Sequence, residues 1–422
     1  MVLADRARAS HAAMPGVRRR AVPDSVPRAV IARLDHVNGL QVARIMAEHG
    51  VPVIGMAKHI RHAYCRSRLP ERIVQTDTAT EDLIQTLEAL GPTLGARAVL
   101  FPAGDQQVRL ISAHRDRLRP WFHVMLPDHD VVDLLMDKVR FYAHALEHGF
   151  PIPRTELVHE RADAERIAAT FAFPCVLKPP TSATPMWDTN VPRKAFLLRT
   201  PEEFLDVYDR YGSFAELLIA QEWIDGPSEN LFSCNAYFDV ASEPVATFVA
   251  RKIRQWPPET GDSCLGEECR NDEVLDVAVR LFRSVGFHGL AYLEMKRDAR
   301  TGKHLIVEPN VGRPTGRSSI AEAGGVDLHY TMYADALGLP TPTNVRQTYG
   351  GAKWVYFRRD LQSALWHMHK GDLTMRGYLR SIRGRKRDAL FSWRDPGPFL
   401  WDLAGAAKKL VFGRGRTERA TP

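Results

Sequence analysis

The stretch HLIVEPNVGRPTGRS (residues 304–318) decides the fold, because an apolar run leads directly into a cluster of charged and amide side chains. The run predicts a strand, in which side chains alternate between the two faces. Alternation puts Ile306, Glu308 and Asn310 on one face and packs Leu305 and Val307 into the core on the other. A carboxylate and an amide side by side supply the oxygen ligands that Mg²⁺ prefers.

The preceding segment, GLAYLEMKRD (residues 289–298), predicts a second strand of the same kind that carries Glu294. If the following DARTGK is a hairpin turn, Glu294 and Glu308 face each other across the sheet. Either acid alone is typical of a solvated strand face. Two facing carboxylates, however, repel each other unless a cation lies between them. With Arg313 and Arg317 close by, the pair favours a metal site beside an anionic substrate or a transferred phosphoryl group.

Two lysines upstream are candidates for phosphate contacts. Lys178 ends the short strand predicted in FPCVLKPP, and Lys138 opens a helix in LLMDKVRF. A lysine at a strand end is a compact positive charge that suits a phosphate group. Taken alone, either lysine is more often an ordinary surface residue.

The charge of the chain is unevenly distributed. Its 422 residues suffice for two or three domains and carry a net charge of +7. Residues 1–33 hold 7 Arg against 2 acids, and residues 376–422 hold 12 Lys and Arg against 4 acids, so the body between them is acidic. That body does not indicate nucleic-acid binding. No apolar run long enough to span a membrane and no secretory signal is evident, so we expect a cytoplasmic protein.

The aromatic and basic segment FSWRDPGPFLWDLAGAAKKLVFGRGR (residues 391–416) leaves alternatives open. It could lie on an anionic membrane surface, which predicts a peripheral location at the inner face of the membrane. A small docking helix is favoured over this alternative, because Asp395 and Asp402 interrupt the apolar face. Contact of the segment with a partner is also left open. The sequence also leaves open whether the protein forms a homodimer.

The first hundred residues after the N-terminal leader alternate strands and helices. Residues 29–34 and 51–56 predict two strands around a helix at 40–49, which is a βαβ unit with ligand-binding loops at the strand ends. A helix near 81–90 and a strand at 98–101 continue the pattern. Asp105 follows that strand and either contacts a ligand or caps the next helix. A helix over 133–148 that ends at Gly149 predicts a domain boundary near residues 130–150.

The order of these motifs is more specific than any one of them. Lys138 is followed by VLKP around Lys178, AQEWIDGPSE (220–229), RKIRQWPPETG (251–261), Glu294 and VEPN (307–310). In this order the chain resembles the ATP-grasp superfamily of carboxylate ligases. Within that superfamily it is similar to bacterial ligases of the D-aspartate ligase type and to the large-chain lobes of carbamoyl-phosphate synthase.

The resemblance implies the fold class and its boundaries. The fold would be α/β and α+β, with a Rossmann-like pre-ATP-grasp domain followed by a two-lobed ATP-grasp domain. The implied order is a disordered basic leader (1–27), the pre-ATP-grasp domain (28–130), the ATP-grasp domain (131–345, with a hinge near 221–229) and a basic C-terminal extension (346–422).

The resemblance also implies the roles of individual residues. Those expected to bind ATP are Lys138 and Lys178 at the phosphates, and Gln221, Glu222, Trp223, Ile224 and Glu229 at adenine and ribose, with Gln221 an alternative to Glu222 for the adenine amine. Those expected to bind Mg²⁺ or Mn²⁺ are Glu294, Glu308 and Asn310. Those expected near the transferred phosphoryl group or acyl phosphate are Arg251, Lys252 and Arg313.

The implied reaction is ATP- and Mg-dependent ligation. A small-molecule carboxylate would be activated as an acyl phosphate and joined to an amine, in cell-envelope or polysaccharide modification, while the loop at 179–195 or at 255–268 closes as a lid. The sequence leaves open a carboxylase, an acid kinase, and a nucleotide-binding regulatory protein without turnover.

Overall fold

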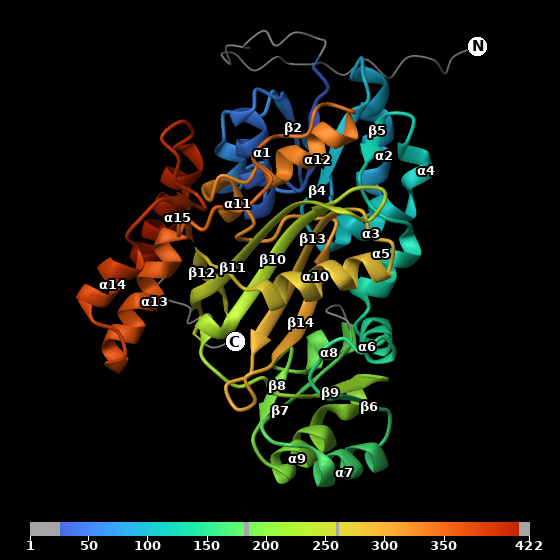
Figure 1. The fold of residues 1–422 in the computed structure, drawn as a ribbon, viewed down its shortest axis with the longest axis vertical. Coiled ribbons are helices and arrows are strands. Elements are labelled where there is room, and N and C mark those ends of the chain that lie inside the picture. Colours follow the sequence, from blue (N-terminus) through green and yellow to red (C-terminus); the bar gives the residue numbers. More distant parts are fainter. Residues whose placement is uncertain (1–25, 181–184, 259–260, 413–422) are drawn as a thin grey trace, which may run out of the picture.

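The computed structural model describes residues 26–180, 185–258 and 261–412. Its first unit is a five-stranded parallel sheet in the order β3-β2-β1-β4-β5 (Figure 1). The strands are β1 (Ala29–Ala32), β2 (Val53–Ala57), β3 (Arg72–Gln75), β4 (Ala98–Pro102) and β5 (Phe122–Val124). The predicted βαβ unit is confirmed, because β1 pairs in parallel with both β2 and β4.

The helices α1 (Val37–Glu48), α2 (Asp82–Leu90), α3 (Asp105–Ala113) and α4 (Arg115–Leu118) connect these strands. The first of them begins earlier than predicted, because the His36 side chain accepts a hydrogen bond from the Asn38 amide and caps its N-terminus. All residues of β1 are buried, so helices cover both faces of this sheet.

The predicted helix over 133–148 is wrong in one respect, since it is two helices. α5 (His129–Met136) ends before Asp137, and α6 (Lys138–Glu147) begins after it. Asp137 is extended, with φ −86° and ψ 118°, and its side chain accepts a hydrogen bond from the Arg140 amide. An aspartate that can cap a new helix competes with continuing the old one, so Lys138 stands in a first turn.

The second unit is a four-stranded antiparallel sheet in the order β6-β9-β7-β8. Its strands are β6 (Thr155–Val158), β7 (Cys175–Lys178), β8 (Phe196–Leu198) and β9 (Leu218–Glu222), and its helices are α7 (Arg161–Thr170), α8 (Pro185–Asn190) and α9 (Pro201–Tyr211). Figure 1 shows this sheet as a separate lobe at one end of the molecule.

The largest sheet has seven strands in the order β14-β13-β10-β11-β12-β15-β16. Its strands are β10 (Leu231–Phe238), β11 (Pro244–Trp256), β12 (Asp262–Glu268), β13 (Gly289–Arg297), β14 (His304–Val311), β15 (Lys353–Val355) and β16 (Lys386–Asp388). Helix α10 (Asp272–Ser284) packs on one face, with Leu293 and Met295. α12 (Leu328–Ala336) and α1 pack against the other face, with Leu290 and Tyr292; α11 (Ile320–Ala323) lies on that side as well.

The segment predicted as a C-terminal extension contributes to this sheet. β15 pairs antiparallel with β12 and parallel with β16. Three further helices follow or interrupt these strands: α13 (Phe357–Lys370), α14 (Met375–Ser381) and α15 (Gly397–Phe412). The division of the chain at residues 130 and 345 stays a prediction, and nearly all of the proposed leader lies outside the described residues. Among the described helices, none is long and apolar enough to cross a bilayer.

Candidate active site

A cleft of about 1,410 Å³ lies where the three sheets and α13 approach one another. It is lined by eleven of the thirteen residues predicted from the sequence: Lys178, Gln221, Glu222, Trp223, Ile224, Glu229, Lys252, Glu294, Glu308, Asn310 and Arg313. The two predicted residues absent from its lining are Lys138 and Arg251. The structure therefore gathers residues from positions 178 to 313 around one space.

The facing carboxylates were predicted correctly, but their strand is not regular. Glu294 and Glu308 are direct partners in the antiparallel pair β13–β14, whereas the next partner of β13, Met295, pairs with Ile306. Val307 is thus the extra residue of a β-bulge, which reverses the alternation. The prediction that Ile306 shares the face of Glu308 is wrong: Ile306 is fully buried in the core under α10.

The electrostatics of the carboxylate pair fit a divalent cation. Glu308 is exposed to the cleft, yet it lies deep among protein atoms, and burial followed by the charge of Glu294 raises the pKa of its carboxyl. Asn310 donates to Glu308 Oε1 over 3.3 Å. Two carboxylates and an amide oxygen on one face are a donor set that suits Mg²⁺, whose charge would remove their repulsion.

Arg313 is held between α3 of the first unit and strand β14. Its Nη2 donates to Asn310 Oδ1 over 2.7 Å, and its Nε donates to Asp105 Oδ1 over 2.5 Å. Asp105 is the first residue of α3, and no side-chain hydrogen bond caps this helix. Asp105 anchors Arg313, and through it the asparagine, to the loop after β4. A direct contact of Asp105 with a ligand stays a prediction.

Arg317 is the most unusual side chain in the cleft. Its side chain is only 4% exposed, its Nη2 lies 3.7 Å from Glu294 Oε1, and its Nη1 donates to Ser263 Oγ over 3.1 Å. Its Nε and Nη2 find no hydrogen-bond partner within the described residues. Burial of the guanidinium lowers its pKa. Arg317 lines the cleft, and a buried cation there with donors left without a partner suits an anionic group of a ligand.

Lys178 stands at the end of β7 and is positioned by an amide. Its Nζ donates to Gln221 Oε1 over 3.0 Å, while Gln221 Nε2 donates to Thr155 Oγ1 over 3.0 Å. Gln221 therefore orients the lysine in addition to lining the cleft. Burial and the nearby charge of Lys138 lower the pKa of Lys178 to about 8, although Glu308 opposes the shift. Lys138 thus lies within electrostatic reach of the cleft without lining it.

The segment between the small and large sheets lines the cleft with Glu222, Trp223, Ile224 and Glu229. Lys296 fastens it to β13, since its Nζ donates to the Ile224 carbonyl over 2.8 Å and lies 4.9 Å from the centre of the Trp223 ring. Sequence reasoning missed Lys296. The signal was available, because Lys296 follows Glu294 by two positions in a strand.

Lys252 and Arg251 lie on opposite faces of β11. Lys252 is 8% exposed in the cleft, and its Nζ donates to Gln255 Oε1 over 2.9 Å. Arg251 shares the face of Val249 and forms an ion pair with Glu267 over 3.0 Å. The expectation that both would approach the phosphates is corrected here, since neighbours in a strand point to opposite sides.

The far end of the cleft comes from segments distant in sequence. It is lined by Asp35, His36, His62, Tyr64, Asp262, Tyr356, Arg359 and His367. Arg359 forms an ion pair with Asp262 over 3.1 Å. Burial, followed by the charges of Arg33 and Arg313, lowers the pKa of His36 to about 4. These residues have no shared sequence motif, which is why sequence reasoning did not find them.

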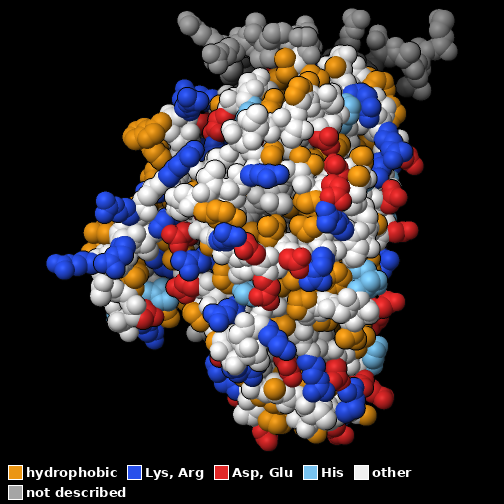
Figure 2. All heavy atoms as spheres, viewed as in Figure 1, with side chains coloured by type: hydrophobic (Ala, Val, Ile, Leu, Met, Phe, Trp, Pro, Cys, Tyr) orange, Lys and Arg blue, Asp and Glu red, His pale blue; other side chains and the backbone are white. Residues whose placement is uncertain are grey.

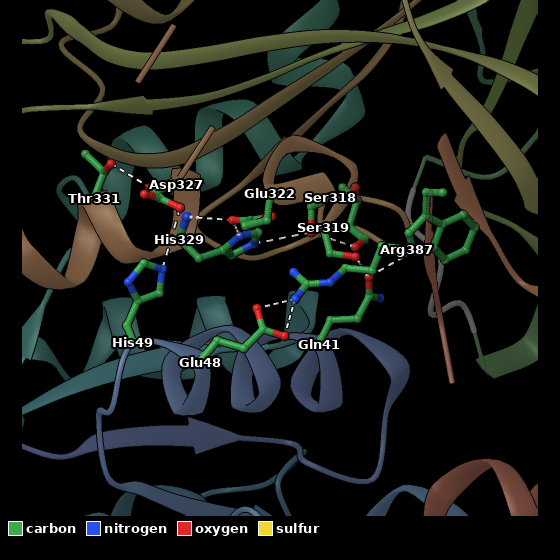
Figure 3. A network of polar contacts seen from close by, with 12 residues as sticks. Gln41, Glu48, His49, Ser318, Ser319, Glu322, Asp327, His329, Thr331 and Arg387 are labelled. Atoms are coloured by element: carbon green, nitrogen blue, oxygen red, sulfur yellow. Dashed lines mark hydrogen bonds and ion pairs between the residues drawn. The ribbon is translucent and has the colours of Figure 1, made fainter. Parts of the chain in front are cut away.

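A buried polar network includes Ser318 and Ser319, which follow Arg317 in the same turn (Figure 3). His329 Nδ1 is 2.6 Å from Glu322 Oε1, and its Nε2 is 3.3 Å from both Ser318 Oγ and Tyr292 Oη. Gln41 of α1 donates to the Gly316 carbonyl over 2.8 Å and accepts a hydrogen bond from Ser319. The turn is therefore fixed on both sides of Arg317.

One curated protein with a clear sequence similarity is the D-aspartate ligase of Enterococcus faecium (strain Aus0004). It is 27% identical over 229 residues, which cover 52% of this chain and 54% of the relative. The chain thus matches about half the length of that relative. A scan against models of protein families finds no match.

Two solved structures are similar in fold. The ADP complex of N5-carboxyaminoimidazole ribonucleotide synthetase has a TM-score of 0.60 at 14% identity, covering 84% of this chain and 87% of that one. The biotin carboxylase domain of Hydrogenobacter thermophilus 2-oxoglutarate carboxylase, solved with MgADP and bicarbonate, has a TM-score of 0.58 at 15% identity, covering 76% and 72%. They confirm the predicted fold class, a Rossmann-like domain followed by two lobes.

Proposed function

We propose that this chain, which has the ATP-grasp fold, is an ATP- and Mg-dependent ligase that activates a carboxylate as an acyl phosphate and joins it to an amine. The observation that carries the proposal is the arrangement of Glu294, Glu308 and the unpartnered donors of Arg317 around one cleft. Facing carboxylates suit a cation, and a buried guanidinium suits the anion that the cation accompanies.

The first step is phosphoryl transfer to the substrate carboxylate. Mg²⁺ held by Glu294, Glu308 and Asn310 would neutralise charge on the phosphates of ATP. Lys178, oriented by Gln221, offers its ammonium to those phosphates from β7. Arg317 lies in the turn after β14 and Lys252 lies in β11, from where they would stabilise the charge that develops on the transferred group.

The second step is attack of an amine on the acyl phosphate, which forms the amide bond and releases phosphate. The chain needs no covalent nucleophile for this step. The far end of the cleft carries both signs of charge: Asp35 and Asp262 are negative and Arg359 is positive, and Arg313 adds a second positive charge to the cleft lining. Such a mixture fits small molecules with both carboxylate and amino groups. Closure of the segment at 179–195 or of the one at 255–268 remains a proposal; the first contains α8, the second contains β12, and residues 181–184 and 259–260 lie outside the described part.

The test is a matrix of ADP-release assays with Mg-ATP, a panel of carboxylic acids and a panel of amines. D-aspartate belongs in both panels, because the relative is named for it and it has both groups. We expect ADP only when an acid and an amine are both present, no ADP after chelation of Mg²⁺, and a new amide in the mass spectrum. ATP binding without ADP under every condition contradicts catalysis and favours the regulatory alternative.

A carboxylase is the second candidate, favoured by the fold similarity to a biotin carboxylase domain crystallised with bicarbonate. Bicarbonate in the acid panel separates the two proposals. If ADP release requires bicarbonate and the product is carboxylated, the carboxylase replaces the ligase as the proposed function. ADP release with an organic acid alone, without any amine, indicates an acid kinase. A role in cell-envelope or polysaccharide modification stays part of the proposal.

A further inference from the structure

The C-terminal helices α13 and α14 expose an unusual amount of apolar surface. The described residues include sixteen large hydrophobic side chains that are exposed, and nine of them fall between positions 357 and 403. Five belong to what we call the α13–α14 face: Phe357, Leu361, Leu365, Met375 and Leu379. Isolated exposed apolar residues are common on proteins, whereas several on two successive helices favour an interaction surface.

Helix α13 exposes large apolar side chains to solvent, whereas a helix that packs only against the core would bury them. The residues buried against the large sheet are Asp360, Ser363 and Ala364, while Leu361 is 38% and Leu365 56% exposed. Both carboxylate oxygens of Asp360 accept hydrogen bonds from Arg254, so this side of α13 is fixed against the large sheet. The leucines recur every four residues after Phe357, so they form a stripe along the exposed side.

Helix α14 repeats the arrangement and adds charge. Met375 is 58% and Leu379 55% exposed, while Tyr378 between them is buried. Each exposed apolar residue is followed by an exposed arginine, Arg376 and Arg380. Residues 357–381 hold five Lys and Arg against two acids. Figure 1 shows α13 and α14 at the edge of the molecule, and Figure 2 shows Lys and Arg side chains projecting there.

We propose that the α13–α14 face docks on an anionic lipid bilayer, with Leu361, Leu365, Met375 and Leu379 entering the interface and Arg376 and Arg380 contacting phosphate headgroups. A bilayer offers an apolar layer beneath a negative surface, which matches both properties. A symmetric dimer through the same face would bring the arginines of two copies together, so charge disfavours a second copy. Nucleic acid offers phosphates but no apolar layer to receive the leucines.

The location gives this surface a consequence for the proposed ligase. Trp366 and His367 of α13 line the far end of the cleft, so the same helix borders the cleft and carries the docking face. A membrane-bound enzyme would receive an acceptor that is itself attached to the bilayer. This consequence rests on the proposed function, whereas lipid binding can be measured without any turnover.

The experiment is co-sedimentation of the full-length protein with vesicles of phosphatidylcholine alone and of phosphatidylcholine mixed with phosphatidylglycerol. We expect binding to the mixed vesicles only, weakened by salt. The double variant Arg376→Gln/Arg380→Gln should bind about fivefold more weakly for each arginine removed. Leu361→Ser/Leu365→Ser should reduce binding about tenfold or more.

The matched control is Arg210→Gln/Arg280→Gln, two exposed arginines of other helices, each paired with an acid four residues before it. It should bind vesicles like the wild type. Equal binding of wild type and both test variants overturns the proposal, and so does equal binding to neutral vesicles. A wild-type dimer that Leu361→Ser/Leu365→Ser converts to a monomer assigns the face to a second copy instead. ADP release in solution is scored separately, so the ligase proposal stands or falls independently.

Discussion

Two polar clusters lie on either side of the turn at 316–319, one around Arg317 and one around His329. They differ in how far the buried side chain is hydrogen-bonded. On the cleft side, Arg317 keeps two donors without a partner within the described residues. On the other side, His329 is fully buried, and both its ring nitrogens lie within hydrogen-bond distance of neighbours (Figure 3). Unsatisfied buried groups cost stability, whereas satisfied networks contribute rigidity. Glu322 Oε2 beside His329 also lacks a partner within the described residues, so the difference lies in the two cations themselves. The guanidinium of Arg317 keeps free donors, whereas both nitrogens of the His329 imidazole are engaged.

Strand β14, which carries Glu308, lies on the cleft side of the turn, and a change at Glu308 gives the largest expected effect. Glu308→Gln keeps the size of the side chain and removes the charge that the metal needs. We expect turnover with Mg-ATP to fall by about a thousandfold, since charge stabilisation at a transferred phosphoryl group is a major part of catalysis. Thermal unfolding should be unchanged or slightly raised, because the repulsion with Glu294 is relieved. Turnover at the wild-type rate would refute the metal assignment.

Two buried arginines, Arg317 in the cleft and Arg254 beneath α13, can be compared by changing each to methionine. Arg317→Met should lower kcat/KM about a hundredfold, the usual cost of losing a preorganised donor, while the protein stays as stable as the wild type or becomes more so. Arg254→Met should instead lose about 3–5 kcal/mol of stability, because Asp360 is left buried without its partner. Denaturant titrations and steady-state kinetics distinguish the two. Equal loss of stability in both would show that Arg317 is structural.

On the side of the turn away from the cleft, His329→Ala removes the contact between His329 and Glu322. Burial raises the pKa of Glu322, but the charge and hydrogen bonds of His329 outweigh it and hold that pKa below its ordinary value. Removing the imidazole leaves a buried carboxylate unpaired, so we expect a loss of about 3–5 kcal/mol. Turnover per folded molecule should change less than about tenfold. The double variant His329→Ala/Glu322→Gln should recover part of the stability, and a purely additive loss would contradict the coupling.

Lys178 gives the smallest effect, a dependence of ATP affinity on pH. Burial and Lys138 lower its pKa to about 8 in the free protein. Phosphates bind the protonated form of Lys178, so ATP affinity should be highest below that pKa. It should fall about tenfold as the pH rises through the two units centred on that pKa. Isothermal titration in buffers of different ionisation enthalpy should detect proton uptake on binding near that pH. Lys178→Met should bind weakly without this dependence, and a pH dependence retained in the variant would point to another group.

Much of this site was predictable because strand alternation and a short hairpin determine which side chains meet. Glu294 and Glu308 follow from those rules alone, as does the parallel order of β1, β2 and β4. The bulge at Val307 was not predictable, because one extra residue leaves no pattern in the letters yet reverses the faces. Arg251 and Lys252 were both assigned to the phosphates, although adjacent strand residues cannot share a face.

Other parts depend on contacts between distant segments. The strands β15 and β16 form because β12 offers a partner to β15 and β15 offers one to β16, and three residues are too few to show a strand pattern in the sequence. The far end of the cleft joins loops near residues 36, 62 and 262 to α13, and no local spacing links them. The donors left free on Arg317 are likewise a property of its surroundings, which the sequence alone does not display.

The account depends most on transfer of the γ-phosphoryl group to a substrate carboxylate, and isotope transfer measures that directly. The acid that supports ADP release is prepared with its carboxylate labelled with oxygen-18, and the released phosphate is analysed by mass spectrometry after reaction with the amine. The account predicts one labelled oxygen in each phosphate, since the carboxylate oxygen that attacks ATP leaves with the phosphate. Unlabelled phosphate, or release of AMP in place of ADP, would contradict an acyl phosphate and with it the proposed ligase.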